Sequence, residues 1–443
     1  MLNEKTDEGL KSAVGVSGLA LAVVNGVIGA GIFALPGIVG AALGTFAIFG
    51  YIFCSIMLAA IMLCYAEVGS RVTTSGGSYA YVAAAFGDFP GYIINWLYFF
   101  GWSILSSAAL MNVIADSLAV LFPLFINPVI RGFLFFVLIG FIVLINLRGA
   151  KQGIGFIKLI TIIKLLPLIA IILFGFSKVK TGNLHWDHIP ALKTFGDTAL
   201  ILFLAFAGFE TSLGNSGEFK NPKRTVPLGI LLGGIIILVV YMLLQTVTQG
   251  VLGPAMVEFI DAPLAAVAEK IIGPAGATIL LITAAISCFG CVISDVLATP
   301  RLLFAGANNG LFPKFLGKVH PKFATPHRAI ITYGALIFIL SISGGFKQLA
   351  ILASAAILVI YLAVILATIK LRSIKQYLSE KTFRAPGGLL FPIIGIATII
   401  WLLSSLGKWE ILSTIIFIAV VSIIYFLTKY FKKEKTITVP ACE

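Results

Sequence analysis

Residues 15–40 read GVSGLALAVVNGVIGAGIFALPGIVG, an apolar run without a charged side chain. An α-helix needs about 20 such residues to cross the hydrocarbon core of a membrane. Gly26, Gly29, Gly31 and Pro36 fall inside this run. Because glycine and proline both weaken a helix interior, the stretch predicts a membrane-spanning helix that is broken near its centre.

A second broken helix is expected near the middle of the chain. Residues 206–217 read FAGFETSLGNSG, so glycines again interrupt an apolar run. Broken helices at corresponding places in two halves are typical of transporters built from inverted repeats, and their unwound backbone binds the ligand. The two interrupted stretches are five spans apart, as expected if spans 1–5 and 6–10 form such repeats. The same glycines also suit close helix packing, and this alternative stays open.

The composition is that of a multi-spanning membrane protein. Of the 443 residues, 59% are hydrophobic and only 11% are charged, with a mean hydropathy of +1.07. So few charges cannot cover a water-soluble fold, and the apolar runs are too long for the alternating strands of a membrane β-barrel. The net charge of +13 reflects Lys and Arg concentrated in one alternate set of loops. This bias predicts that both termini are cytoplasmic, and it explains the charge without a nucleic-acid partner.

The apolar runs predict the domain organisation. Twelve spans are expected, at residues 15–40, 43–68, 92–120, 130–147, 152–176, 195–217, 227–251, 275–305, 329–344, 348–370, 389–406 and 410–430. The expected fold class is therefore all-α and polytopic, with five-helix repeats at 15–176 and 195–370 and two added helices at 389–430. Residues 1–14 are expected to form a cytoplasmic N-terminus. Residues 431–443 are expected to form a basic cytoplasmic tail that meets anionic membrane lipid.

Several separated motifs carry a resemblance to a known family. They are GAGIF at 29–33, GGSYAY at 76–81, GFE at 208–210, NPKR at 221–224, GLFPKF at 310–315 and TPH at 325–327. In this order and spacing, the chain resembles the amino acid–polyamine–organocation (APC) superfamily, and within it the bacterial amino acid permeases and antiporters. The resemblance implies the leucine-transporter fold, with helices 1 and 6 broken at mid-membrane. It also implies movement of an amino acid or related amine by alternating access.

The broken segments offer the groups that a zwitterionic amino acid needs. Backbone N–H groups at 30–33 would face its carboxylate at the positive end of a helix dipole. Carbonyls of residues 206–208, Val27 and Ile28 would accept from its ammonium. Nearby aromatic side chains either line the pocket or serve only packing. The candidate substrate-binding residues are Val27, Ile28, Gly29, Ala30, Gly31, Ile32, Phe33, Trp102, Phe206, Ala207, Gly208, Glu210 and Asp295.

Charged residues deep in a span are costly and therefore point to function. Lys164 resembles the helix-5 lysine that replaces a sodium ion in proton-coupled or sodium-independent members, so it is either the proton-coupling group or a fixed structural cation. Glu210 is either a functional acid or a brace for the broken segment. Asp295 departs from the family pattern, and it recognises a cationic side chain, pairs with Lys164 or braces its helix. Glu67 and Asp116 lie near span ends, and we expect them to be solvated.

Other function classes find little support in the sequence. The spans contain no histidine and no carboxylate pair at catalytic spacing, which argues against an enzyme. The H-x-x-H at 185–188 lies in a loop without further ligands, and the C-x-x-C at 288–291 fits packing within one helix, so no cofactor or metal is expected.

We therefore predict a secondary active transporter of the cytoplasmic membrane that couples amino acid movement to protons. A pH-insensitive amino acid or polyamine exchanger is one alternative. A non-transporting membrane sensor or assembly partner is an alternative of another class. The oligomeric state is left open.

Overall fold

The computed structural model describes residues 14–74, 76–148, 150–185, 189–213, 219–260, 262–308, 312–323, 325–374 and 382–437. Residues 1–13, His188, Gly310 and residues 438–443 of the predicted tail lie outside this part, as do the side chains from 430 onward. The described residues are helical and contain no β-strand.

The α-helices follow one another along the chain with short connections. They are α1 (Val16–Val27), α2 (Gly31–Leu43), α3 (Ala47–Arg71), α4 (Gly77–Phe86), α5 (Asp88–Trp96), α6 (Ile104–Leu121), α7 (Pro128–Arg148), α8 (Ala150–Gly175), α9 (Leu192–Phe203), α10 (Pro222–Leu252), α11 (Pro263–Ile272), α12 (Pro274–Asn308), α13 (His327–Ser343), α14 (Phe346–Leu371), α15 (Leu390–Ser404) and α16 (Lys408–Ile437). A π-helical segment, η2 (Leu97–Ser103), joins α5 to α6.

The twelve predicted spans all fall on apolar helices, but the structure divides them differently. In the described residues, nine helical stretches are long and apolar enough to cross a membrane. Three shorter apolar helices accompany them: α1, α13 and α15, with 12, 17 and 15 residues. The first long stretch, Gly31–Arg71, joins α2 to α3, because α1 ends before the glycines and the second half of that run continues as a separate helix. The chain is therefore a polytopic all-helical membrane protein.

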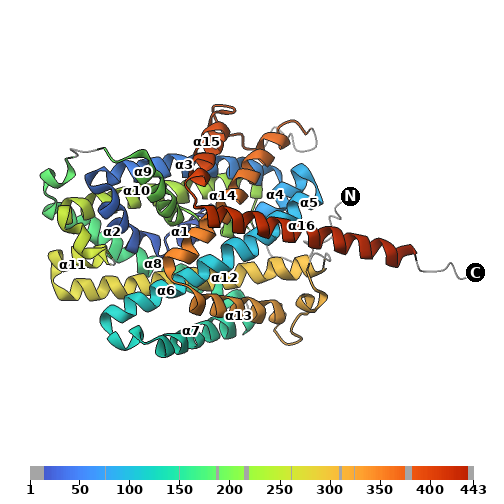
Figure 1. Ribbon diagram of the computed structural model, residues 1–443, viewed down its shortest axis with the longest axis horizontal. Helices are drawn as coiled ribbons and strands as arrows, with labels where there is room; N and C mark the ends of the chain where they lie inside the picture. Colours follow the sequence, from blue (N-terminus) through green and yellow to red (C-terminus); the bar gives the residue numbers. More distant parts are fainter. Residues whose placement is uncertain are drawn as a thin grey trace, which may run out of the picture.

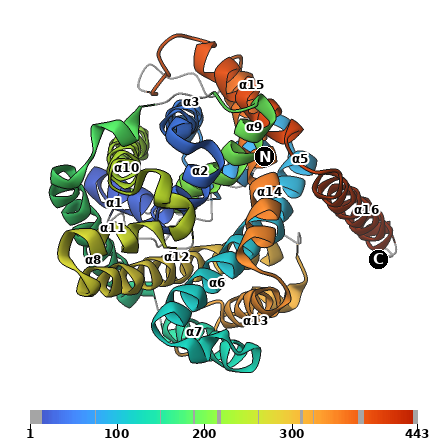
Figure 2. The same cartoon turned by 60° about the vertical axis from the view of Figure 1, so that its left-hand side comes forward.

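The two halves of the first broken run lie inside the helix bundle. Helix α1 packs against α8, α10 and α12, and α2 packs against α3 and α9 (Figure 2). By contrast, α16 lies on the outside and extends beyond the other helices (Figure 1). Only 6% of its most apolar window is buried, and for α7 the share is 17%. Apolar faces of this kind are stable next to lipid, whereas the polar and glycine-rich segments occupy the interior.

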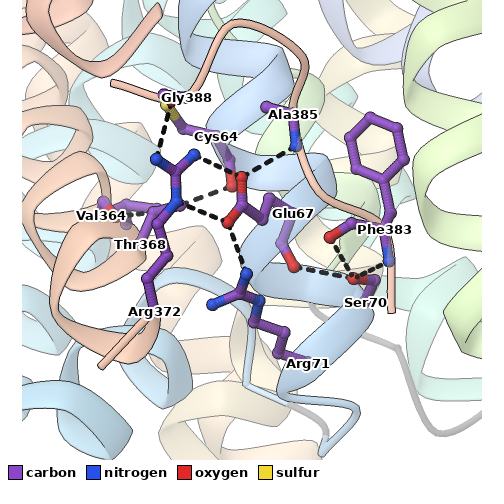
Figure 3. A network of polar contacts seen from close by, with 10 residues as sticks. All are labelled: Cys64, Glu67, Ser70, Arg71, Val364, Thr368, Arg372, Phe383, Ala385 and Gly388. Atoms are coloured by element: carbon purple, nitrogen blue, oxygen red, sulfur yellow. Dashed lines mark hydrogen bonds and ion pairs between the residues drawn. The ribbon is translucent and has the colours of Figure 1, made fainter. Parts of the chain in front are cut away.

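A buried ion-pair cluster centred on Glu67 joins the end of α3 to the end of α14 (Figure 3). Glu67 Oε1 accepts from Arg71 Nη2 at 2.7 Å, and Arg372 Nη2 donates to Oε2 at 2.7 Å. The backbone N–H of Ala385 donates to the same carboxylate at 3.0 Å, which ties the loop before α15 to both helices. Since the Glu67 side chain is 0% exposed, it is not solvated as expected. Its hydrogen bonds to Arg372 raise the pKa of that guanidinium, which stays charged.

Replacing Glu67 with glutamine is expected to destabilise the protein by about 3–5 kcal/mol, because removing one partner leaves buried, uncompensated arginines. The change should appear as a lower melting temperature of the detergent-purified protein. The matched control is Asp116→Asn, which breaks the ion pair with Arg131 where the aspartate side chain is 56% exposed. An exposed pair is worth only about 0–1 kcal/mol. Equal melting temperatures for the two variants would contradict this assignment.

Candidate functional site: a cavity between two broken helices

The first interruption lies between α1 and α2. Helix α1 ends at Val27, and Ile28 leaves the helical conformation with ψ 83°. Helix α2 begins at Gly31, so three residues connect the two helices. The first N–H groups of a helix have no partner within it, and here they lie in the protein interior. The break therefore presents donors at the start of α2 and free carbonyls at the end of α1.

The second interruption follows α9. The chain continues as two short 3₁₀ segments, η6 (Leu204–Phe206) and η7 (Phe209–Leu213). Between them, Ala207 is extended and Gly208 has φ 115°. A side chain rarely tolerates this φ, so the sequence breaks the helix where glycine is available. Both interruptions predicted from the glycines are thus present.

The two interruptions touch each other through glycines. A Cβ on Gly26 would lie 2.8 Å from the carbonyl oxygen of Gly208, and a Cβ on Gly208 would lie 2.6 Å from that of Gly26. A Cβ on Gly31 would lie 2.4 Å from the Cβ of Ala205. Close packing therefore requires these three glycines. Gly29 differs, because its Cβ would meet only side-chain atoms, at 3.4 Å.

A cavity of about 80 Å³ lies where the interruptions meet. Of the candidate substrate-binding residues, the cavity is lined by Val27, Gly29, Ala30, Gly31, Trp102, Ala207, Gly208 and Asp295. Its wall also includes Gly26, Ser106, Ser107, Ala109, Leu110, Leu204, Thr211, Cys291, Ser294 and Phe346. Trp102 lies on the π-helical segment η2, and such segments are frequent at functional sites.

Five candidates lie outside this wall: Ile28, Ile32, Phe33, Phe206 and Glu210. Phe206 was the strongest aromatic candidate, but its ring packs against Tyr51 and Tyr241 and is fully buried. The carbonyl of Ile28 accepts from Lys164 and from Ser287, so it serves the protein's own side chains.

Lys164 on α8 reaches the first interruption. Its Nζ lies 2.9 Å from the carbonyl oxygen of Asn25 and 2.5 Å from that of Ile28, and the Sγ of Cys291 is 3.9 Å away. The side chain is fully buried, and within the described residues no carboxylate pairs with it. An ammonium held by the carbonyls that end α1 replaces the helix partners that these carbonyls lack. Lys164 therefore links α8 to the broken helix.

Glu210 stabilises the second interruption rather than lining the cavity. Its Oε2 accepts from the backbone N–H of Gly208 at 3.1 Å and from the hydroxyl of Tyr361 at 2.5 Å. Its Oε1 is buried and has no hydrogen-bond partner. The carboxylate thus bridges the break and α14.

Asp295 on α12 borders the cavity within a group of hydroxyls. Its carboxylate accepts from Ser103 at 2.8 and 2.7 Å, from Ser107 at 2.7 Å and from Thr299 at 2.8 Å. The hydroxyl of Tyr333 on α13 donates to the same carboxylate. These bonds join η2, α6, α12 and α13. No ion pair connects Asp295 with Lys164 in the described structure.

Sequence reasoning missed several polar contacts around the first break. The amide of Asn25 donates to the Ser294 hydroxyl at 2.9 Å, and Cys291 Sγ lies 3.1 Å from the carbonyl oxygen of Asn25. The Tyr241 hydroxyl donates to the carbonyl of Ala205 at 2.9 Å and lies 3.2 Å from that of Val27. The available signal was a polar residue, Asn25, directly before the glycines of an apolar run.

The site does not offer a ligand set typical of a metal centre. Among the described residues, no group of three His, Cys, Asp or Glu side chains is placed to hold a metal ion. Cys288 and Cys291 are buried and free rather than paired in a disulfide.

Comparison with known proteins points to one family. Residues 14–425 match the family described as amino acid permease. The chain is 28% identical over 410 residues to the serine/threonine exchanger SteT of Bacillus subtilis (strain 168), covering 90% of this chain and 92% of that protein. It is 30% identical over 434 residues to the methylthioribose transporter of the same organism, covering 92% and 91%.

A third relative is the branched-chain amino acid permease BcaP of Lactococcus lactis subsp. cremoris (strain MG1363), which is 27% identical over 394 residues, or 84% of each chain. These relatives are transporters and not enzymes, and each match spans most of both chains. This chain therefore belongs to the amino acid permease family of the APC superfamily and is a multi-pass membrane transporter.

Proposed function

We propose that the protein moves an amino acid across the cytoplasmic membrane by alternating access and couples this movement to protons. The observation that carries the proposal is the contact between two broken helices at a single cavity, with Gly26 against Gly208. The names of the relatives, which include a serine/threonine exchanger and a branched-chain amino acid permease, support an amino acid substrate.

The substrate's α-carboxylate would bind at the start of α2. The backbone of Gly29, Ala30 and Gly31 borders the cavity, and the first-turn N–H groups there have no helical partners. The helix dipole adds a favourable field for a negative charge. The α-ammonium would bind the carbonyls of Ala207 and Gly208, which border the same cavity.

The transport cycle would use the leucine-transporter fold. Twelve spans, with 1–5 and 6–10 as inverted repeats, account for interruptions in the first and sixth spans and for their meeting in the interior. Lys and Arg are concentrated in the loops on the side of both termini, which supports cytoplasmic termini. Rocking of one repeat against the other would open the cavity to each side in turn.

Lys164 would be the proton-coupling group. Its ammonium holds the carbonyls of Asn25 and Ile28 at the end of α1. Loss of the proton would remove the charge from these hydrogen bonds and loosen the broken helix from α8. Because the cavity is bordered by the same broken helix, protonation and substrate binding would then depend on each other.

The direct test is uptake into proteoliposomes that contain the purified protein. We expect saturable uptake of at least one standard amino acid, with stronger accumulation when the inside is made alkaline. Exchange against internal substrate, measured without a pH gradient, separates a proton-coupled carrier from an exchanger. No uptake and no exchange of any standard amino acid would contradict the proposed function and favour a sensor or assembly role.

A further inference from the structure

We propose that the hydroxyl-lined Asp295 carboxylate is a subsite for a second positive charge on the substrate. The transported molecule would then be an amino acid or related amine with a cationic side chain. This inference rests on the proposed function, because it assumes that the cavity is the substrate site. It adds the chemical class of the side chain that the cavity receives.

The first step concerns reach. Asp295 and Ser107 border the same cavity as Gly29 and Gly31 at the interruption of the first span. One small molecule in this cavity can therefore contact the start of α2 with its carboxylate and the Asp295 group with its side chain. Helix α12 places Asp295 there together with Ser294, one residue earlier, which also borders the cavity.

The second step concerns hydrogen atoms. Ser103 Oγ has one proton, yet it lies within 2.9 Å of both Asp295 oxygens, Thr299 Oγ1 and the Tyr333 hydroxyl. A hydroxyl donates only one proton, so it cannot satisfy all of these oxygens. The group is therefore rich in oxygen lone pairs and poor in protons. An ammonium, which brings three N–H donors and no acceptor, has the complementary hydrogen-bonding pattern.

The third step concerns charge. Asp295 is the one charged side chain among the described residues that border the cavity. Nearby Lys164 is directed to backbone carbonyls, and the described ion pairs do not include Asp295. Hydroxyl dipoles orient a carboxylate but leave its net charge uncompensated in a water-poor interior, which is costly. A cationic side chain supplies the missing counter-charge each time the substrate binds.

A purely structural role for Asp295 predicts something different. The carboxylate would then hold η2, α12 and α13 together, and its removal would weaken all ligands alike. The two roles are separated by a pair of ligands with the same shape and different charge. L-ornithine and L-norleucine are such a pair, because an ammonium in one replaces a methyl group in the other.

The experiment measures the affinities of L-ornithine and L-norleucine in proteoliposomes by exchange of the labelled amino acids. For the unaltered protein, we expect ornithine to bind at least about tenfold more tightly, as one charge-assisted hydrogen bond would provide. In Asp295→Asn, ornithine affinity should fall about 10–100-fold while norleucine affinity changes by less than about threefold. The control is Asp197→Asn, which removes an exposed carboxylate on α9 and should preserve the preference.

Each outcome decides the inference. Equal affinities of the unaltered protein for the two ligands would overturn it, and this comparison does not require that a variant folds. An equal loss of both ligands in Asp295→Asn would assign a structural role to the carboxylate. In either case, transport of norleucine would leave the proposed function standing. If neither ligand nor any standard amino acid is exchanged, the proposed function fails as well.

Discussion

Replacing Gly208 with alanine is expected to reduce uptake by more than about a hundredfold. The φ of 115° at this position is strained for any residue with a side chain, at a cost of about 1–3 kcal/mol. The new Cβ would also lie 2.6 Å from the carbonyl oxygen of Gly26. Because the opposing atom belongs to the backbone, no rotamer change relieves the overlap, and the two broken helices must separate.

Initial rates of amino acid uptake into proteoliposomes, at equal amounts of folded protein, measure this effect. The control is Gly140→Ala in the middle of α7, where an added Cβ would meet no atom within 4 Å. This control should retain uptake and gain a little stability from the better helix propensity of alanine. Uptake by Gly208→Ala within about threefold of the unaltered protein would show that the two breaks need not touch.

Lys164→Ala is expected to lose proton-driven accumulation while keeping part of the exchange activity. The substitution removes the ammonium from the carbonyls of Asn25 and Ile28 and leaves two buried acceptors without their donor. Each unsatisfied group costs about 1–3 kcal/mol, so the end of α1 should loosen from α8. Net uptake driven by an imposed pH gradient should fall more than about tenfold, and counterflow should survive better because it needs no net proton movement.

A second variant keeps this test decisive if alanine destabilises the fold. Lys164→Met retains most of the side-chain volume without the charge and should show the same loss of pH-driven uptake. Lys193→Ala is the control, because that lysine is 89% exposed and pairs only with Asp197 at the surface. An undiminished dependence of net uptake on the pH gradient in Lys164→Met would rule out Lys164 as the coupling group. Unaltered protein that exchanges amino acids equally at every pH would be a pH-insensitive exchanger.

The positions of the helix breaks were predictable because their causes are local. Gly26, Gly29 and Gly31 lie in one apolar run, and Gly208 interrupts another, so sequence spacing alone locates both interruptions. The membrane class is equally local, since it follows from the length and polarity of successive runs. The reason for the glycines was only partly predictable, because the clash partners of Gly31 and Gly208 lie on the other broken helix.

The composition of the cavity wall was not predictable from spacing. Phe206 directly adjoins the break, yet it packs against Tyr51 and Tyr241 outside the wall. Its direction depends on where two other helices place their rings. Glu67 gave the same lesson, because proximity to a span end suggested solvation and only α14 supplies the arginine that buries it.

The sequence by itself determined that this chain crosses a membrane as helices and that two of the runs are interrupted by glycine. Both properties arise from residues that are neighbours along the chain. Only the tertiary structure decided that Lys164 reaches Asn25, 139 positions away, and that Ser103 reaches Asp295, 192 positions away. Contacts over such separations depend on how whole helices pack, and no short-range pattern encodes the direction in which each side chain points.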